Sequence, residues 1–486
     1  MTNSSTAVSP PQSHDAPQRG LSNRHIQLIA IGGAIGTGLF MGSGRTISLA
    51  GPAVIFVYML IGFFLYFVMR AMGELLLSNL HYKTFADFAA DLIGPWAGFF
   101  VGWSYWFCWI VTAVAELVAI TGYLQFWWPN IPLWLPTLLV VAIVFVLNAA
   151  SVKNFGEMEF WFALIKVVAI LALIVVGVVM VLTHFSSPDG HVAQVSNLWN
   201  DGGWFPNGVS GMVAGFQIAV FAFVGVELVG TTAAEARDPR VTLPRAINSV
   251  PVRILIFYVG ALLAILVVTP WRSIDPDSSP FVAMFSLAGL AGAASVVNFV
   301  VLTSATSSAN SGVFSTSRML FGLSAKGSAP RLFKGLNSAG VPLRALLLTA
   351  VILVLTIPVL YAGDSIMDAF TLITSVASLL FIFVWTMILI SYMRYRKKFP
   401  QRHAESAYKM PGGVVMCWVV LAFFAFLVWA LSTDPDTATS LIAFPVWIIA
   451  LCVAWFFVRR RESHHEAFEQ FKRDMDAPQE IHHTEG

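Results

Sequence analysis

Hydrophobic residues occur along this chain in long blocks, and short polar segments separate one block from the next. Each block is about 20 residues long, the length that an α-helix needs to cross the hydrocarbon core of a bilayer. The pattern therefore predicts an all-α integral membrane protein, built from helices rather than as a barrel. Twelve membrane-spanning helices are predicted, at about residues 26–49, 52–78, 95–124, 133–151, 157–183, 208–235, 245–269, 281–311, 343–361, 365–393, 412–432 and 440–458.

The composition and the two ends of the chain fit this picture. Of the 486 residues, 57% are hydrophobic and only 11% are charged, well below the roughly one-quarter charged residues of a soluble domain. Residues 1–20 are rich in Ser, Pro and Gln and contain no apolar segment typical of a signal peptide, so we expect a disordered tail there. Residues 21–460 are expected to form one membrane domain, and residues 461–486 a charged tail.

The positions of Lys and Arg predict the orientation of the chain in the membrane. With the amino terminus inside, 24 of the 28 Lys and Arg residues fall in inner segments and tails, whereas Arg45 and Arg272 fall outside. Arg70 and Lys166 lie within spans. Both termini are therefore expected in the cytoplasm. This topology accounts for the positive residues, so no nucleic-acid partner is expected.

Cysteine and histidine usage gives no sign of a metal or a cofactor. Cys108, Cys417 and Cys452 all lie in apolar spans and share no C-x-x-C spacing, so we expect neither a disulfide framework nor a metal site. The ten histidines lie in polar segments or tails, or at the outer end of a span, which argues against a buried haem or an intramembrane histidine relay.

The first span has a high density of glycine. Its central stretch, IAIGGAIGTGLFMGSG at 29–44, contains six glycines. Glycine is favoured in a membrane helix where two helices touch closely or where the backbone leaves the helical path. Gly38 and Gly42 form a G-x-x-x-G pair, which is typical of a packing face. A G-x-G-x-x-G nucleotide fingerprint is excluded, because Met41 stands where the third glycine would be.

Packing alone does not explain Gly36 and Gly38 on either side of Thr37, near the middle of the span. A break there frees peptide N–H groups of one half-helix and C=O groups of the other at bilayer depth, where unsatisfied groups are costly. The positive end of a half-helix suits a carboxylate, and free carbonyls suit an ammonium group or a cation. A zwitterionic amino acid supplies both charges, so we expect a broken helix that binds one.

A second interrupted span supports this interpretation. The sixth span has Gly225 near its centre, followed by Glu227. The first and sixth spans therefore match as the first helices of two inverted five-helix repeats. The repeats cover about 26–183 and 208–393, and the last two spans, at about 412–458, lie outside them.

Among the charged residues within predicted spans, three lie in apolar surroundings. Glu116, Lys166 and Glu227 are surrounded by apolar residues, where each costs about 2.5 to 3.5 kcal/mol on the insertion scale. Lys166 lies about nine residues, or roughly 14 Å, from the inner end of its span, so a proton-carrying role is favoured over snorkelling to the interface. Glu227 either carries a proton or accepts bonds from the freed amides of its own broken helix. Glu116 either pairs with Lys166, lines the cavity or bonds a neighbouring hydroxyl.

The eighth span carries a run of small hydroxyl residues, TSATSSANSG at 303–312. Such residues allow helices to pack closely and to bond to one another, and their oxygens also coordinate cations. Packing and bonding between helices is the favoured interpretation for most of them.

Five stretches of sequence connect the chain to a known family. They are GGAIGTGLFMGSG, VMRAMGELLL, NFGEMEFWFALIKV, FAFVGVELVGTTAAE and SSANSGVFSTSRMLFGL, in this order between about 21 and 461. With them the chain resembles the bacterial amino acid transporter family of the amino acid–polyamine–organocation superfamily. The resemblance implies a leucine-transporter-like fold with broken first and sixth helices, alternating access, and a place in the bacterial inner membrane.

The resemblance also implies roles for residues at the two breaks. The substrate carboxylate would meet backbone amides of the first break, and the ammonium would meet backbone carbonyls of both breaks. The implied substrate-binding residues are Ala34, Gly36, Thr37, Gly38, Phe221, Val224 and Gly225. Phe221 would lie over the substrate as a gate. Lys166 would take the place of a coupling cation, which implies proton coupling, with Glu116 and Glu227 as further candidates.

These expectations combine in one functional hypothesis. The chain is expected to be a secondary transporter that imports small zwitterionic amino acids by proton symport, with glycine, D-alanine and D-serine implied by the resemblance. The same spans also suit a permease for larger neutral or aromatic amino acids, since Phe221, Phe223 and Trp109 either fill the cavity or stack on a ring. A membrane receptor for an amino acid is the alternative from another class. An enzyme is not expected, because no nucleophile, base and orienting group occur together at motif spacing.

Overall fold

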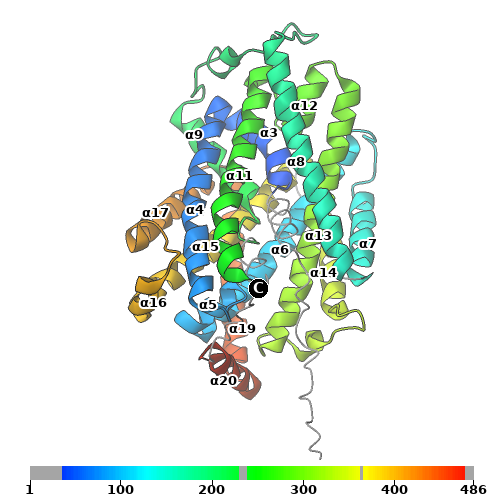
Figure 1. Ribbon diagram of the computed structural model, residues 1–486. Helices are drawn as coiled ribbons and strands as arrows, with labels where there is room; N and C mark the ends of the chain where they lie inside the picture. The colour runs from blue at the N-terminus through cyan, green and yellow to red at the C-terminus, as the bar shows by residue number, and fades with distance from the viewer. Residues whose placement is uncertain (1–34, 151, 229–237, 362–364, 477–486) are drawn as a thin grey trace, which may run out of the picture.

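The computed structural model describes residues 35–150, 152–228, 238–361 and 365–476 of the chain. Within these ranges the regular secondary structure is helical, apart from one isolated β-bridge. Most of the long helices run along a common direction and form an elongated bundle (Figure 1). The all-α prediction is confirmed.

Every predicted span corresponds to helical segments in the described part of the chain. Nine segments there are long and apolar enough to cross a membrane, and one of them, Gly42–Ser78, holds the second part of the first predicted span together with the second span. Two shorter apolar segments, Trp134–Ala149 and Gly208–Phe223, account for the fourth span and for much of the sixth. The corresponding helices are α2 (Thr37–Phe40), α3 (Gly42–Ala50), α4 (Val54–Ser78), α6 (Pro95–Gln125), α7 (Trp134–Ala150), α8 (Val152–Leu182), α9 (Gly208–Ala219) with the 3-10 helix η3 (Val220–Phe223), α11 (Pro239–Val268), α13 (Ala291–Ala325), α14 (Leu343–Leu355), α15 (Ile366–Lys398), α17 (Gly413–Leu431) and α19 (Ser440–Val458).

The bounds predicted for the eighth span, 281–311, are wrong. The structure divides this region into a short helix, α12 (Pro280–Leu287), and the long helix α13, which begins at Ala291 and continues to Ala325. Gly289, with φ +76°, lies in the turn between them. Hydropathy does not register such a turn, because a glycine in a left-handed conformation is as apolar as one in a helix.

The seventh span begins earlier than its predicted start at 245. α11 starts at Pro239, and the carboxylate of Asp238 accepts the first-turn N–H of Val241 at 3.4 Å. Pro244 lies inside the helix, as does a second proline. Prolines are tolerated within membrane helices because neighbouring groups satisfy the freed carbonyls, so a start placed after the proline is too late.

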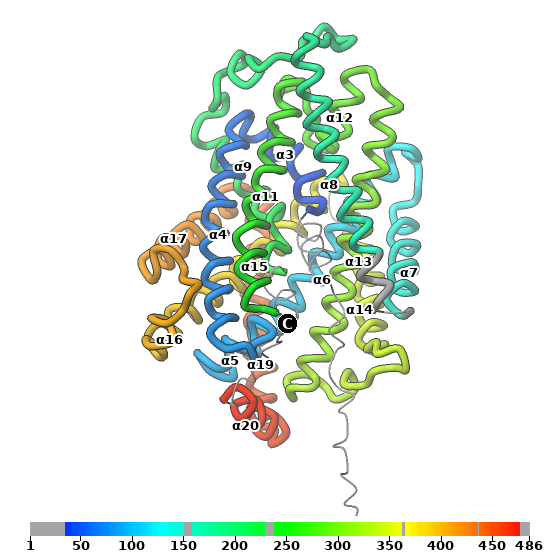
Figure 2. The backbone as a smooth tube through the Cα atoms, viewed as in Figure 1, coloured from blue at the N-terminus to red at the C-terminus, as the bar shows by residue number. Residues whose placement is uncertain are grey.

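Helices of the first half of the chain pair with their counterparts in the second half. α3 contacts α9, α4 contacts α11, α6 contacts α13 and α7 contacts α14, so each of the first four spans contacts the span five places later. Figure 2 shows the blue α4 beside the green α11. Two intertwined five-helix repeats produce this pairing, which supports the predicted repeat, and the last two helices, α17 and α19, both pack against α15.

Of the two predicted tails, only part of the C-terminal one lies in the described residues. It forms a helix, α20 (Glu462–Asp476), whose Met475 carbonyl accepts a bond from Nδ2 of Asn79 at 3.0 Å. The tail predicted at 1–20 lies outside the described residues, as do residues 477–486.

A short helix, α5 (Phe85–Leu92), lies at the same end of the bundle as α20 (Figure 1). The buried carboxylate of Asp87 in its first turn accepts the N–H groups of Lys83 and Thr84, both at 2.9 Å. The same carboxylate forms a salt bridge with Lys326 at the C-terminal end of α13. Burial by itself raises the pKa of Asp87, but the Lys326 ammonium and the two N–H donors outweigh it and lower the pKa below its usual value.

The lowered pKa of Asp87 makes the attachment of α5 sensitive to acid. A carboxyl group whose pKa is lower in the folded protein stabilises the fold above its unfolded-state pKa, and the contribution is lost as the pH falls through the folded-state pKa. Asp87→Asn should therefore lower the melting temperature of the detergent-solubilised protein at pH 7. The difference from wild type should shrink below about pH 4. Thermal melts at both pH values check this, with Asp189→Asn on an exposed loop as the control, and an equal difference at both values would contradict it.

Candidate functional site

The first described helix begins in the middle of the first predicted span. Gly36 precedes α2 with a non-helical backbone (φ −124°, ψ −163°), and its carbonyl accepts the N–H of Phe40 at 3.4 Å. Thr37 and Gly38 therefore lie in the first turn, where N–H groups have no partner within the helix. A helix therefore starts just after Gly36, within the break predicted at 36–38, while Ala34 and the residues before it lie outside the described residues.

The sixth span is interrupted as predicted. α9 tightens into η3, after which Val224 is extended (ψ 137°) and Gly225 has φ +94°, a conformation that residues other than glycine rarely adopt. The carboxylate of Glu227 accepts the Gly225 N–H at 3.2 Å and the hydroxyl of Tyr105 at 3.1 Å. Glu227 thus accepts a bond from an amide of its own broken helix, which is one of the two roles that the sequence analysis left open. Its proton-carrying role stays a prediction.

The two interrupted helices touch backbone to backbone. A Cβ atom on Gly38 would lie 2.6 Å from the Cα of Ala222 in η3, and one on Gly42 would lie 3.0 Å from Cγ2 of Ile218 in α9. Residues four apart share one helix face, so a face of each helix meets the other. The glycine pair is therefore a packing face, and it also borders the break, so both interpretations of the glycines hold.

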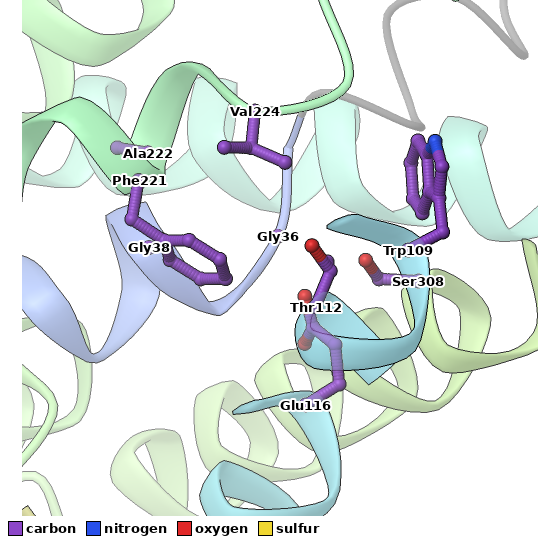
Figure 3. Close-up of a pocket in the computed structure, with 9 residues that line it drawn as sticks. All are labelled: Gly36, Gly38, Trp109, Thr112, Glu116, Phe221, Ala222, Val224 and Ser308. Carbon is purple, nitrogen blue, oxygen red and sulfur yellow. The ribbon is translucent and has the colours of Figure 1, made fainter. Parts of the chain in front are cut away.

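A small cavity lies where the two breaks meet (Figure 3). It is bordered by α2, α6, η3 and α13, with Val224 just beyond η3. Its lining residues are Gly36, Gly38, Trp109, Thr112, Glu116, Phe221, Ala222, Val224 and Ser308. Those that the sequence predicts for the site are Gly36, Gly38, Trp109, Glu116, Phe221 and Val224. The other predicted residues within the described part of the chain are not among the lining residues; they are Thr37, Lys166, Phe223, Gly225 and Glu227.

Three buried side-chain atoms at or beside the cavity make no hydrogen bond by distance and angle among the described residues: Oε2 of Glu116, Oγ1 of Thr37 and Nε1 of Trp109. Thr37 and Ser308 nevertheless lie close enough to the Glu116 carboxylate to stabilise it. The backbone of Gly36 passes so close to Glu116 that a Cβ at this position would lie 2.8 Å from Oε1 of the carboxylate. An unpaired buried acceptor is costly. The arrangement therefore fits a ligand that donates a hydrogen bond to Glu116.

Phe221 projects from η3 toward the cavity (Figure 3). Its ring packs edge to face against Phe370 of α15, with centroids 6.0 Å apart and an interplanar angle of 88°. The Phe221 carbonyl accepts the N–H of Val224 at 3.1 Å, which leaves one of its two lone pairs for a ligand. The ring has support from α15, and its role as a gate stays a prediction.

Lys166 lies in α8, where only 1% of its surface is exposed. The carboxylates of Glu159 and Glu116 are among its electrostatic partners. Glu159 is absent from the sequence-based predictions, although it precedes Lys166 by seven residues and so lies on the same face of the helix. That spacing is the signal by which the sequence could have revealed it.

The hydroxyl run of the eighth span bonds to neighbouring helices. Oγ of Ser304 donates to the carbonyl of Ile35 at 3.3 Å, and Oγ of Ser307 donates to Glu159 at 2.9 Å. Ser308 lines the cavity. The hydroxyls of Thr303 and Thr306 instead donate to carbonyls of their own helix, so only part of the run connects α13 to other segments.

Fold and site together define a class of membrane protein. A bundle of apolar helices with repeated halves, and with a polar cavity where two interrupted helices meet, is the architecture of a secondary transporter. The sequence profile of the family described as "Amino acid permease" matches residues 25–466, and the chain therefore belongs to this family. It is a membrane transporter and not an enzyme.

The relatives of the chain are transporters from bacteria. It is 62% identical to the D-serine/D-alanine/glycine transporter of Escherichia coli (strain K12), over 92% of this chain and 95% of that protein. It is 42% identical to the DL-alanine permease SerP2 of Lactococcus lactis subsp. cremoris (strain MG1363), over 90% and 95% of the two chains. It is 40% identical to the aromatic amino acid transport protein AroP of Escherichia coli O6:H1, again over 90% and 95%.

Proposed function

We propose that this protein imports small zwitterionic amino acids, namely glycine, D-alanine and D-serine, by proton symport with alternating access. The observation that carries the proposal is the cavity between the two interrupted helices, which combines the first-turn amide of Gly38 with the carboxylate of Glu116, whose Oε2 makes no hydrogen bond among the described residues. A substrate carboxylate suits the amide, and a substrate ammonium suits Glu116 and the carbonyls of η3.

The size of the cavity supports small substrates. The cavity is small, and the rings of Trp109 and Phe221 line it, so they restrict the space for a substrate side chain. The relative at 62% identity is named for D-serine, D-alanine and glycine, and the relative at 42% for DL-alanine. Both names support short side chains and tolerance of the D configuration.

Proton coupling is proposed from the position of Lys166. A buried ammonium in a membrane helix is costly and releases its proton readily, and here it lies in the field of two carboxylates, Glu159 and Glu116. Glu116 borders the cavity, so a substrate bound there changes the electrostatic field at Lys166 and can influence whether this lysine holds a proton.

The proposed setting is the bacterial inner membrane, with residues 21–460 as one permease domain and both termini in the cytoplasm. The asymmetry of Lys and Arg along the sequence supports this orientation. In Figure 1 the short helices α5, α16 (Pro400–Glu405) and α20 gather at one end of the bundle, which we propose to be the cytoplasmic end.

A permease for larger neutral or aromatic amino acids is the second candidate. Trp109 and Phe221 line the cavity, and their rings offer faces on which an aromatic side chain can stack. The relative at 40% identity is named for aromatic amino acids.

Uptake of labelled glycine into proteoliposomes under an imposed inward proton gradient tests the proposal. Unlabelled D-alanine, D-serine and L-phenylalanine serve as competitors. Accumulation that an uncoupler collapses and that the two D-amino acids block supports proton-coupled transport of small substrates. Block by phenylalanine alone favours the second candidate, and label that does not exceed the amount of protein indicates binding without transport.

Phe221→Ala should widen the substrate range. Removal of the ring opens the cavity toward Phe370, so L-phenylalanine should inhibit glycine uptake at concentrations at least roughly tenfold lower than in wild type. Competition curves for both proteins measure this, and Phe299→Ala on an exposed face of α13 is the control. An unchanged phenylalanine curve would show that Phe221 does not limit the size of the substrate.

A further inference from the structure

A second polar cluster lies within the bundle around Glu159 of α8. Only 2% of this residue is exposed. One of its carboxylate oxygens accepts Oγ of Ser307 at 2.9 Å, and the other accepts Nδ2 of Asn310 at 3.0 Å. Both donors belong to α13, and Glu159 is not among the residues that line the cavity.

The amide groups near Glu159 have a defined orientation. Nδ2 of Asn148, in α7, donates to Oδ1 of Asn310 at 2.7 Å and to the carbonyl of Val144 at 2.9 Å. Oδ1 of Asn310 therefore faces Asn148, and its NH2 group faces Glu159. Turning either amide would set two acceptors against each other. Glu159 thus meets hydrogen-bond donors, which stabilise a carboxylate anion and do not suit the oxygen shell of a metal cation.

A positive charge lies on the same face of α8. Glu159 and Lys166 are about two helical turns apart, and helix side chains lean toward the N-terminus, so the chain of Lys166 leans toward Glu159. Glu159 and Glu116 are among the electrostatic partners of Lys166. Lys166 therefore lies in the field of two different carboxylates. Hydrogen-bond donors fix Glu159 outside the cavity, whereas Glu116 borders the cavity and its Oε2 makes no hydrogen bond among the described residues.

We propose that Glu159 is a positioning residue for proton coupling, the permanent counter-ion of Lys166, and that it sets the pH range in which this lysine carries a proton. The inference rests on the proton symport proposed above. A lone ammonium is costly in a membrane interior, and a fixed anion beside it offsets that cost. Two neighbouring helices hold this anion of α8 in place, α13 through Ser307 and Asn310 and α7 through Asn148, which orients Asn310.

Glu159→Gln tests the proposal, because it keeps the size of the side chain and removes its charge. Uptake of labelled glycine into proteoliposomes is measured against the external pH. Without the anion the ammonium form of Lys166 persists only in more acid medium, so the pH midpoint of uptake should move down by about one unit or more. Glycine counterflow, which needs no net proton movement, should persist.

Three further variants separate this role from a merely structural one. Glu159→Asp keeps the charge, so its pH midpoint of uptake should lie closer to the wild-type value than that of Glu159→Gln. Ser307→Ala removes one donor and leaves both charges, so it should give a smaller shift in the same direction, and it replaces Glu159→Gln if that variant does not fold. Glu74→Gln is the matched control, because Glu74 is a buried carboxylate in a separate cluster, where it accepts the N–H of Met410 at 2.8 Å and pairs with His403. It should leave the midpoint unchanged.

The outcomes distinguish this inference from the proposed function. A wild-type midpoint in both Glu159→Gln and Ser307→Ala overturns the role of Glu159. If uptake by Lys166→Met at the same time no longer depends on pH, the proposal of proton coupling through Lys166 is retained. A wild-type protein whose uptake has no pH midpoint overturns the proposed coupling, and this inference with it.

Discussion

Lys166→Met should abolish accumulation of glycine against its gradient while leaving exchange of glycine across the membrane in place. For one proton per substrate, a pH difference of two units supports up to about 100-fold accumulation, since each unit contributes one factor of ten. The thioether of methionine fills the space of the lysine stem but carries no proton. Without a coupled proton the internal concentration should rise no further than the external one. Steady-state uptake with and without the gradient measures this, and counterflow measures exchange.

The matched control is Lys334→Met, the same change at an exposed lysine. Lys166→Met also strands the carboxylates of Glu159 and Glu116 in a buried place, and an unpaired buried charge destabilises a protein by about 3–5 kcal/mol. The double variant Glu159→Gln/Lys166→Met removes one stranded charge. It should improve the yield of folded protein without restoring accumulation. Normal accumulation in Lys166→Met would remove this lysine from the mechanism.

Much of the fold follows from the sequence because the bilayer imposes simple rules. An apolar block of membrane length has to form a helix, so the number and order of the spans can be predicted. The details that differ depend on single residues. Gly289 turns the chain inside an apolar run, and Pro244 lies inside a helix that appeared to start after it. Both residues act through the backbone, to which hydropathy is insensitive.

The residues of the candidate site also fall into two groups, those that the sequence predicts and those that depend on tertiary packing. The breaks at Gly36 and Gly225 could be predicted, because glycine in the middle of an apolar span allows the backbone to leave the helix. The backbone groups freed in this way need a polar partner in lipid, which indicates a binding site. Thr112 was out of reach, since which face of α6 meets the breaks depends on the rotation of packed helices. Ser308 belongs to the hydroxyl run that the sequence singles out, but its place at the cavity depends on the rotation of α13 in the same way. Glu159 was within reach by its spacing from Lys166, but its partners on α13 depend on tertiary contacts.

Gly38→Ala should prevent stable folding, whereas Gly36→Ala should give a folded protein with weakened substrate binding. A Cβ on Gly38 would lie 2.6 Å from the Cα of Ala222, and backbone cannot move aside by changing a rotamer. Overpacking of this kind costs about 1–3 kcal/mol or more. A Cβ on Gly36 would lie 2.8 Å from Oε1 of Glu116, the free end of a flexible side chain, which can turn away. The yield and melting temperature of purified protein measure the first effect, and the KM for glycine measures the second.

The displaced Glu116 would then face away from the cavity, so the KM of Gly36→Ala should rise roughly tenfold, a loss of about 1.4 kcal/mol. Gly42→Ala is the internal comparison, because its Cβ would lie 3.0 Å from a side-chain methyl of Ile218 and not from backbone. Its stability should fall between that of wild type and that of Gly38→Ala. Wild-type stability in Gly38→Ala would contradict the backbone contact between the two breaks, and an unchanged KM in Gly36→Ala would separate the cavity from substrate binding. Substitution of Gly38 should therefore lower mainly the stability, because Gly38 packs against the second broken helix. Substitution of Gly36 should lower mainly the affinity for the substrate, because Gly36 borders the carboxylate of Glu116.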